Sequence, residues 1–290
     1  MPAPALRLPS PLAELHDDRL RRRDIRLYLK RDDLIHPELI GNKWRKLRYN
    51  LDAARDAGHT RLLTFGGAFS NHITATAAAG YYFDFETVGV IRGEPHTPLN
   101  DSLTFAVSRG MKITYLDRQT YRRKTEPDVI AGLRESFGDV YILPEGGSNA
   151  LAVQGCAELP GEIAADFDVL CCACGTGGTL AGVAHGLTSG QRAIGFSVLK
   201  NGDFLAEDVT QLQCSAFGQV GGNWTINTEF HFGGFAKRTP ALDDFIADFR
   251  ARHGIQLDWV YVAKMLYGVF ALVERGAFAP GSRLVAVITG

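Results

Sequence analysis

No stretch of this 290-residue chain stays apolar for the roughly 18 consecutive residues that a membrane-spanning helix requires. An excess of charge is missing as well, since 31 lysines and arginines stand against 32 aspartates and glutamates. Without net positive charge there is no overall attraction to nucleic acid or to an anionic membrane surface, so we expect neither as a partner. Internal repeats and low-complexity tracts are absent too. The length is sufficient for two domains or one large domain.

The chain also lacks the cysteine pattern of a disulfide framework. Five cysteines is an odd number, and Cys171, Cys172 and Cys174 fall in one apolar segment. Cys171 and Cys174 match a C-x-x-C pattern, but residues three apart on a strand point to opposite faces, so we predict no metal site there. The residues Met1 to Arg7 have neither the charged start nor the apolar run of a secretion signal. These features favour reduced thiols in a cytoplasmic protein.

Strand-like and helix-like segments alternate along most of the chain, which predicts an α/β fold with largely parallel sheets. The predicted strands are 25–31, 61–65, 87–91, 112–116, 140–143, 169–173, 193–198 and 283–288. The predicted helices begin near residues 43, 70, 99, 127, 150, 180, 241 and 262. Gly80 is expected to end the helix that Ser70 opens. We assign 51–145 to a small α/β domain and 1–50 plus 146–290 to a large one, with a ligand cleft between them. The charged segment 19–31 is expected to form a solvated face.

A glycine-rich turn follows the predicted strand 169–173. It reads Gly175-Thr176-Gly177-Gly178-Thr179 and leads into a helix, so free backbone amides and the positive end of that helix converge on one point. A dinucleotide fingerprint would require glycine at Leu180, and a Walker loop would require a lysine after the glycines. The turn therefore favours a single phosphate group, and a tight turn without a ligand is the alternative.

Lys43 stands at the predicted start of a helix, directly after Gly41 and Asn42. The positive end of a helix disfavours an ammonium group and should lower the pKa of the lysine toward a nucleophilic amine. A solvated surface lysine is the alternative for this residue alone. An amine that can form an imine and a turn that can hold one phosphate are what pyridoxal phosphate needs from a protein. Together the two motifs predict a pyridoxal-phosphate enzyme of amino-acid chemistry.

A third junction, Gly66 to His72, places polar residues at the start of another helix. Capping of that helix by Ser70 explains the pattern structurally. The functional alternative is that these polar groups bind a carboxylate and a ring oxygen.

Read in order, these motifs resemble one known family. They are Lys30-Arg31-Asp32-Asp33-Leu34, Gly41 to Leu47, Ser70-Asn71-His72, Pro144 to Ala150, Gly175 to Thr179 and Val260-Tyr261-Val262-Ala263-Lys264. The chain is similar, from about residue 8 to 290, to the D-cysteine desulfhydrase and 1-aminocyclopropane-1-carboxylate deaminase family. That resemblance implies a fold type II pyridoxal-phosphate enzyme with the tryptophan-synthase β-subunit fold, in which two parallel-sheet, three-layer domains enclose the cofactor cleft.

The resemblance also implies how the cofactor is held. Lys43 would bind pyridoxal 5′-phosphate covalently and then act as the proton-transferring base, and Asn71 would bond the ring oxygen of the cofactor. Thr289 would lie near the pyridine nitrogen, and as a neutral hydroxyl it would favour elimination over transamination. The phosphate would be held by Gly175, Thr176, Gly177, Gly178 and Thr179.

For the substrate, the resemblance implies a small amino acid bound by Ser70, Asn71, His72 and Tyr261, with Ser70 and Tyr261 in catalytic roles. The expected activity is a deaminating elimination (a lyase or hydrolase reaction) that gives a 2-oxo acid and ammonia, with hydrogen sulfide from D-cysteine. The alternatives are 1-aminocyclopropane-1-carboxylate deaminase and a non-catalytic pyridoxal-phosphate-binding protein. A cytoplasmic homodimer is expected.

Four positions depart from the family pattern. Phe69 stands where the best-known deaminases carry glutamine, and Thr74 stands where arginine is common. Val262 replaces an acidic or hydroxyl residue, and the ending 288–290 is shorter than the usual tail. His72 and Thr289 are closer to the desulfhydrase pattern, so the resemblance favours that activity over the deaminase.

Overall fold

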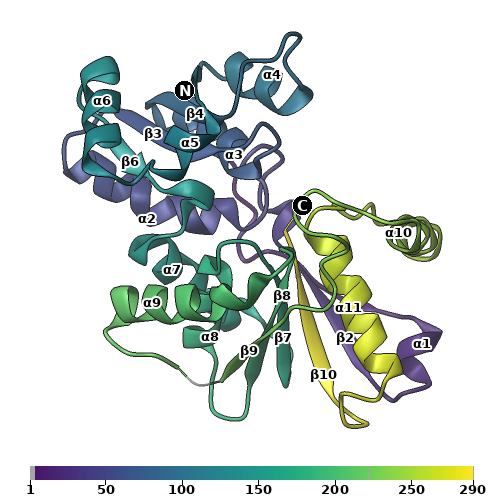
Figure 1. Ribbon diagram of the computed structural model, residues 1–290. Helices are drawn as coiled ribbons and strands as arrows, with labels where there is room; N and C mark the ends of the chain where they lie inside the picture. The colour runs from purple at the N-terminus through teal and green to yellow at the C-terminus, as the bar shows by residue number, and fades with distance from the viewer. Residues whose placement is uncertain (1–3, 222, 290) are drawn as a thin grey trace.

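The computed structural model describes residues 4–221 and 223–289, so residues 1–3 and 290, at the ends of the predicted large domain, and residue 222 lie outside it. Its larger sheet has the strand order β1-β2-β10-β7-β8-β9 (Figure 1). Neighbouring strands are parallel except for β1, which runs antiparallel to β2. The strands are β1 Leu12–Leu15, β2 Arg26–Arg31, β7 Val169–Cys174, β8 Arg192–Ser197, β9 Trp224–Asn227 and β10 Arg283–Ile288.

Helices cover both faces of this sheet, because alternate strand residues point to opposite sides. Leu284 and Ala286 pack with α10 (Pro240–His253) and α11 (Val262–Glu274), whereas Val285 and Val287 pack in a second core on the other face. The helices of the second core and its surroundings are α7 Ala150–Ala157, α8 Gly178–Gly186 and α9 Leu205–Phe217. The short α1 (Asp18–Arg21) contacts α11.

The smaller sheet is entirely parallel, with the order β5-β4-β3-β6. Its strands are β3 Arg61–Gly66, β4 Glu86–Arg92, β5 Lys112–Leu116 and β6 Tyr141–Leu143. One face packs on α5 (Arg118–Arg122) and α6 (Pro127–Phe137), and the other on residues of α2 (Lys43–Asp56), α3 (Asn71–Phe83) and α4 (Asp101–Ser108). The protein therefore consists of two three-layer α/β units, which confirms the predicted architecture.

Several local expectations differ from the structure. β1, α9 and β9 were not predicted, and α3 continues through Gly80 to Phe83. The segment 19–31 is not simply a solvated face, because Lys30 within it and the adjacent Asp32 are completely buried. Burial is possible there because both ions are paired or hydrogen-bonded within the protein, as described below. Among the helices of the described chain, none is long and apolar enough to cross a membrane.

Candidate active site

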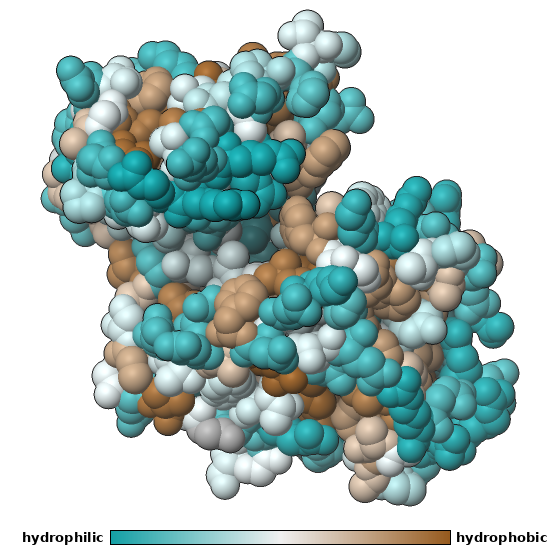
Figure 2. Space-filling view, in the orientation of Figure 1, coloured by the Kyte–Doolittle hydropathy of each residue, from teal (hydrophilic) through white to brown (hydrophobic). Residues whose placement is uncertain are grey.

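A cavity lies where the two units meet, and Figure 2 shows a hollow between the lobes with apolar surface along part of its border. It is formed by the first turns of α2 and α3, the glycine turn before α8, the residue before α11 and the end of β10. The lining residues are Ile40, Asn42, Lys43, Lys46, Asn71, Gly146, Ala173, Cys174, Gly175, Thr176, Gly177, Gly178, Thr179, Leu180, Tyr261 and Thr289. Every predicted cofactor-binding residue therefore borders one cavity.

The glycine turn needs residues without side chains. Gly177 precedes the first residue of α8 with φ of +74°, and a Cβ there would lie 2.8 Å from Val209. At Gly178 a Cβ would lie 2.5 Å from Ser148 Oγ and 3.3 Å from Lys46 Nζ. The side chains of Ser148 and Lys46 thus approach the turn, where the first N–H groups of α8 have no partner within the helix. Such a cradle suits a small anion.

Lys46 also lines the cavity, although the sequence reasoning did not assign it to the cofactor. Its buried ammonium donates hydrogen bonds to the Gly146 carbonyl at 3.1 Å and to Ser148 Oγ at 2.9 Å. Ser148 Oγ in turn lies 2.6 Å from Thr176 Oγ1. Burial lowers the pKa of Lys46, and no carboxylate appears among the described residues that line the cavity. Its place three residues after Lys43, on the same side of a helix, was the available signal.

Lys43 is the first residue of α2, as predicted, and it faces the cavity. Burial, reinforced by the neighbouring Lys46 ammonium, lowers the pKa of Lys43 well below its ordinary value. Two contacts fix the approach to this residue: Asn42 Nδ2 donates to Thr179 Oγ1 at 2.6 Å, and Gly41 packs on Thr289. A Cβ on Gly41 would lie 1.7 Å from the Thr289 carbonyl oxygen, so only glycine fits. The lowered pKa shifts this amine toward its uncharged, nucleophilic form.

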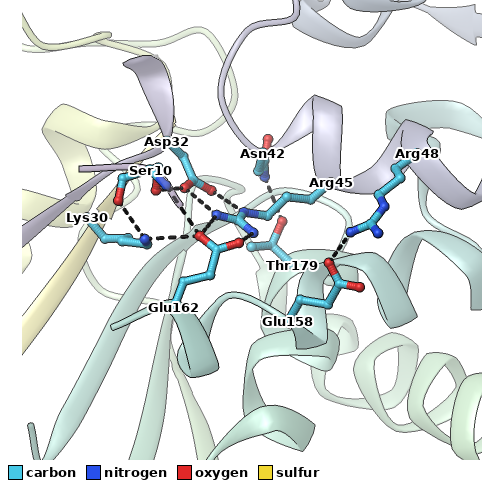
Figure 3. A network of polar contacts seen from close by, with 9 residues as sticks. All are labelled: Ser10, Lys30, Asp32, Asn42, Arg45, Arg48, Glu158, Glu162 and Thr179. Carbon is cyan, nitrogen blue, oxygen red and sulfur yellow. Dashed lines mark hydrogen bonds and ion pairs between the residues drawn. The ribbon is translucent and has the colours of Figure 1, made fainter. Parts of the chain in front are cut away.

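A network of ion pairs holds Arg45, in the first turn of α2, against Asp32 and Glu162 (Figure 3). Arg45 binds Asp32 with two hydrogen bonds of 2.8 and 2.9 Å and Glu162 with two of 2.7 and 2.8 Å. Lys30 Nζ binds Glu162 at 3.1 Å and the Ser10 carbonyl at 2.7 Å. Because Arg45 and Lys30 satisfy both carboxylates, neither acid is left to pair with the lysines of the cavity.

Tyr261 lines the cavity beside the glycine turn. A Cβ on Gly175 would lie 3.2 Å from the Tyr261 ring and 3.8 Å from its hydroxyl oxygen. Asp258 fixes this position, since its carboxylate accepts the backbone N–H groups of Val260, Tyr261 and Val262 at 3.1, 2.6 and 3.2 Å. Burial, followed by the negative charge of Asp258, raises the pKa of Tyr261 and keeps its hydroxyl protonated.

The junction before α3 has both a structural and a cavity-facing part. Ser70 caps the helix, since its Oγ accepts the His72 N–H at 3.3 Å, and it does not line the cavity. Asn71 does line it. His72 is 1% exposed and lies against Gly147, and burial together with Lys43 and Lys46 lowers its pKa and keeps the ring neutral. Neither ring nitrogen has a hydrogen-bond partner within the part of the chain described. Substrate binding by Ser70 and His72 stays a prediction.

The side chains of the cavity fit pyridoxal phosphate. The glycine cradle, the hydroxyls of Thr176 and Thr179 and the Lys46 ammonium match a phosphate group in charge and donor type. Lys43 provides the amine that reacts with an aldehyde, in the same cavity. Fold and site thus define an enzyme of the fold type II class that uses this cofactor.

Comparison with known proteins identifies the family. Residues 5–290 match the model described as "Pyridoxal-phosphate dependent enzyme", and the chain belongs to that family. A putative 1-aminocyclopropane-1-carboxylate deaminase of Pyrococcus furiosus is 32% identical over 286 residues, covering 91% of this chain and 84% of that protein. A D-cysteine desulfhydrase of Yersinia pestis is 28% identical over 286 residues, with 91% and 86% covered. The solved structure of an ACC deaminase homologue superposes with a TM-score of 0.87 at 28% identity, covering 99% of this chain and 92% of that one.

Proposed function

We propose that this protein catalyses a deaminating elimination on a small amino acid, in the manner of a D-cysteine desulfhydrase. With D-cysteine and water, the products are pyruvate, ammonia and hydrogen sulfide. The observation that carries the proposal is that Lys43, with its lowered pKa, faces the same cavity as the glycine turn. Relatives named D-cysteine desulfhydrase and 1-aminocyclopropane-1-carboxylate deaminase, each similar along about nine-tenths of this chain, support it.

When bound, pyridoxal phosphate supplies an electron sink for the electron pair left on the α-carbon of the substrate. The glycine turn, Thr176, Thr179 and Lys46 would hold its phosphate. Asn71 would bond the ring oxygen, and Thr289 would offer a neutral hydroxyl near the ring nitrogen. All of these residues line the cavity.

Lys43 Nζ removes the proton from the α-carbon, and its lowered pKa keeps the amine in the proton-accepting form. The β-substituent then leaves with its bonding electrons. Tyr261 keeps its phenolic proton because burial raises the pKa, so its hydroxyl can donate to the departing group. The substrate carboxylate would be received at the start of α3, where the helix dipole favours an anion: of the three proposed residues Ser70, Asn71 and His72, Asn71 lines the cavity, and Ser70 caps the helix through the His72 N–H.

The test is to incubate the purified holoenzyme with D-cysteine and to measure pyruvate and sulfide together. Equal amounts of the two products are expected. Release of 2-oxobutanoate from 1-aminocyclopropane-1-carboxylate without pyruvate from D-cysteine would favour the deaminase, an alternative supported by the name of the 32% identical relative. Neither product, from a protein that does bind the cofactor, would leave a non-catalytic binding protein.

We also propose that the protein is a cytoplasmic homodimer. Buried cysteines that form no disulfide support a reducing compartment: Cys156, Cys171, Cys172 and Cys174. Sedimentation velocity of the holoenzyme tests the dimer, which predicts twice the chain mass of 31.6 kDa.

A further inference from the structure

A strained turn lies between β9 and α10, next to the cavity wall. Phe232, Gly233, Gly234 and Ala236 all have positive φ, of 51°, 92°, 115° and 51°. For phenylalanine and alanine this conformation is costly, and it persists only where the surrounding structure enforces it. Such backbone strain is concentrated in proteins at sites that position a functional group.

Lys264 of α11 is the residue that enforces this turn. It is completely buried, and its ammonium donates hydrogen bonds to the His231 carbonyl at 2.9 Å and the Gly234 carbonyl at 2.7 Å. Its ammonium is hydrogen-bonded to these two backbone carbonyls, and the nearby charge that acts on it is that of Asp258. Burial lowers its pKa to about 8, which shows how unfavourable this location is for the cation. A buried charge in this role indicates that the position of the turn matters.

The turn carries Phe235, which contacts Tyr261. The Phe235 ring packs edge-to-face on Tyr261, with 5.9 Å between ring centroids and 67° between ring planes. Phe235 is 37% exposed despite this contact, although large apolar side chains normally become buried. Tyr261 itself lines the cavity, whereas Phe235 lies behind that lining and touches the cavity only through its contact with Tyr261.

We propose that Lys264 is a positioning residue that holds the turn 231–236 in place, and that Phe235 thereby forms an apolar subsite beside Tyr261 that favours amino acids whose β-substituent is apolar, such as a thioether. The inference rests on the proposed binding of an amino acid beside Tyr261, and it deepens that function by naming the substrate class. A phenyl ring packs well on an aromatic or thioether substituent, which is larger than the thiol of cysteine.

The test measures binding without turnover. Holoenzyme is titrated with phenylalanine and with alanine, each in both configurations, while the visible band of the cofactor is followed. Neither amino acid carries a leaving group on its β-carbon, so the dissociation constants do not depend on elimination. The intact protein should bind phenylalanine about 10-fold more tightly than alanine in the preferred configuration.

Phe235→Ala should reduce this preference by roughly 3- to 10-fold, the usual range for one aromatic contact. Val107→Ala, which removes an exposed apolar side chain from α4, should leave it unchanged. A preference near one in the intact protein, or one that survives Phe235→Ala, would overturn the proposed subsite.

Lys264→Met should lower the same preference and should speed hydrogen exchange of the amides in 231–237. Lys264→Gln, which retains two N–H donors on a shorter side chain, should be intermediate. The matched control is Lys237→Met, because Lys237 is an exposed lysine of the same turn. Unchanged exchange and unchanged preference in Lys264→Met would refute the positioning role. Absence of pyruvate from D-cysteine, with the preference shifting as expected, would refute the proposed elimination and leave this inference standing.

Discussion

Replacement of Lys46 by methionine should weaken binding of pyridoxal phosphate but not of pyridoxal. Lys46 is buried, it reaches within 3.3 Å of the Cβ position on Gly178, and its hydrogen bonds go to neutral groups, the Gly146 carbonyl and Ser148 Oγ. The positive charge is therefore uncompensated until an anion arrives. Methionine conserves most of the buried volume while it removes the charge.

The magnitude follows from the loss of one partner of a buried charge pair, which costs about 2–5 kcal/mol. The α8 amides and the hydroxyls of Ser148 and Thr176 remain, so we expect the lower end of this range. That corresponds to roughly 30- to 100-fold weaker binding of pyridoxal phosphate. Loss of Lys46 also removes a charge that lowers the pKa of Lys43, but this effect is common to both aldehydes.

The assay titrates apoenzyme with each aldehyde and compares the ratio of dissociation constants between variants. Arg48→Met on the same helix is the matched control, because Arg48 pairs with Glu158 at an exposed position, at 2.5 Å. Exposed pairs contribute little, so the control should change the ratio by less than about two-fold. An equal loss for both aldehydes in Lys46→Met would show that Lys46 does not act on the phosphate, and would refute this reasoning.

Two further predictions concern stability. Gly41→Ala should destabilise the fold by about 2 kcal/mol or more in urea unfolding, because the new Cβ would meet the Thr289 carbonyl. The control is Gly58→Ala, which should cost only about 1 kcal/mol because Gly58 has φ of +79° but open space around it. Equal losses of stability in the two variants would contradict the close packing at Gly41. For Glu162, burial raises its pKa but the hydrogen bonds and charges of Arg45 and Lys30 prevail and lower it to about 2. A lowered carboxyl pKa stabilises the fold above pH 4.5, and this contribution, on the order of 3 kcal/mol, is lost as the pH falls toward 2. Glu162→Gln should abolish that part of the pH dependence of the unfolding free energy. An unchanged acid profile in Glu162→Gln would contradict this assignment.

Periodicity and turn chemistry predicted most of the fold. The parallel strands, the start of α2 at Lys43 and the glycine turn before α8 were all found where expected. Gly80 was misread as the end of α3. A Cβ there would lie 2.3 Å from Thr87, so the glycine serves packing against β4, and Asp84 with φ of 63° ends the helix instead. Sequence spacing does not reveal such a contact between elements.

The two strands that were not predicted, β1 and β9, have weak local signals. β1 is a four-residue edge strand, and β9 is equally short, so neither offers a run of alternating residues long enough to recognise. The network of Arg45, Asp32 and Glu162 joins residues up to 117 positions apart in the chain. Such pairing depends on the tertiary fold, so charged residues at 30–32 resemble surface residues in the sequence. For the same reason Lys264 and Phe235 could be connected only in the structure.

The most direct test of the account is the attachment point of the cofactor. Holoenzyme is reduced with borohydride and digested with a protease, and the masses of its peptides are measured by mass spectrometry. Burial lowers the pKa of both Lys43 and Lys46, but that of Lys43 falls well below its ordinary value, and Lys43 stands at the start of α2 in the cavity. We therefore predict a pyridoxyl group on the peptide that contains Lys43, at that residue alone. Attachment at Lys46, or no attachment in a protein that retains the cofactor, would contradict it.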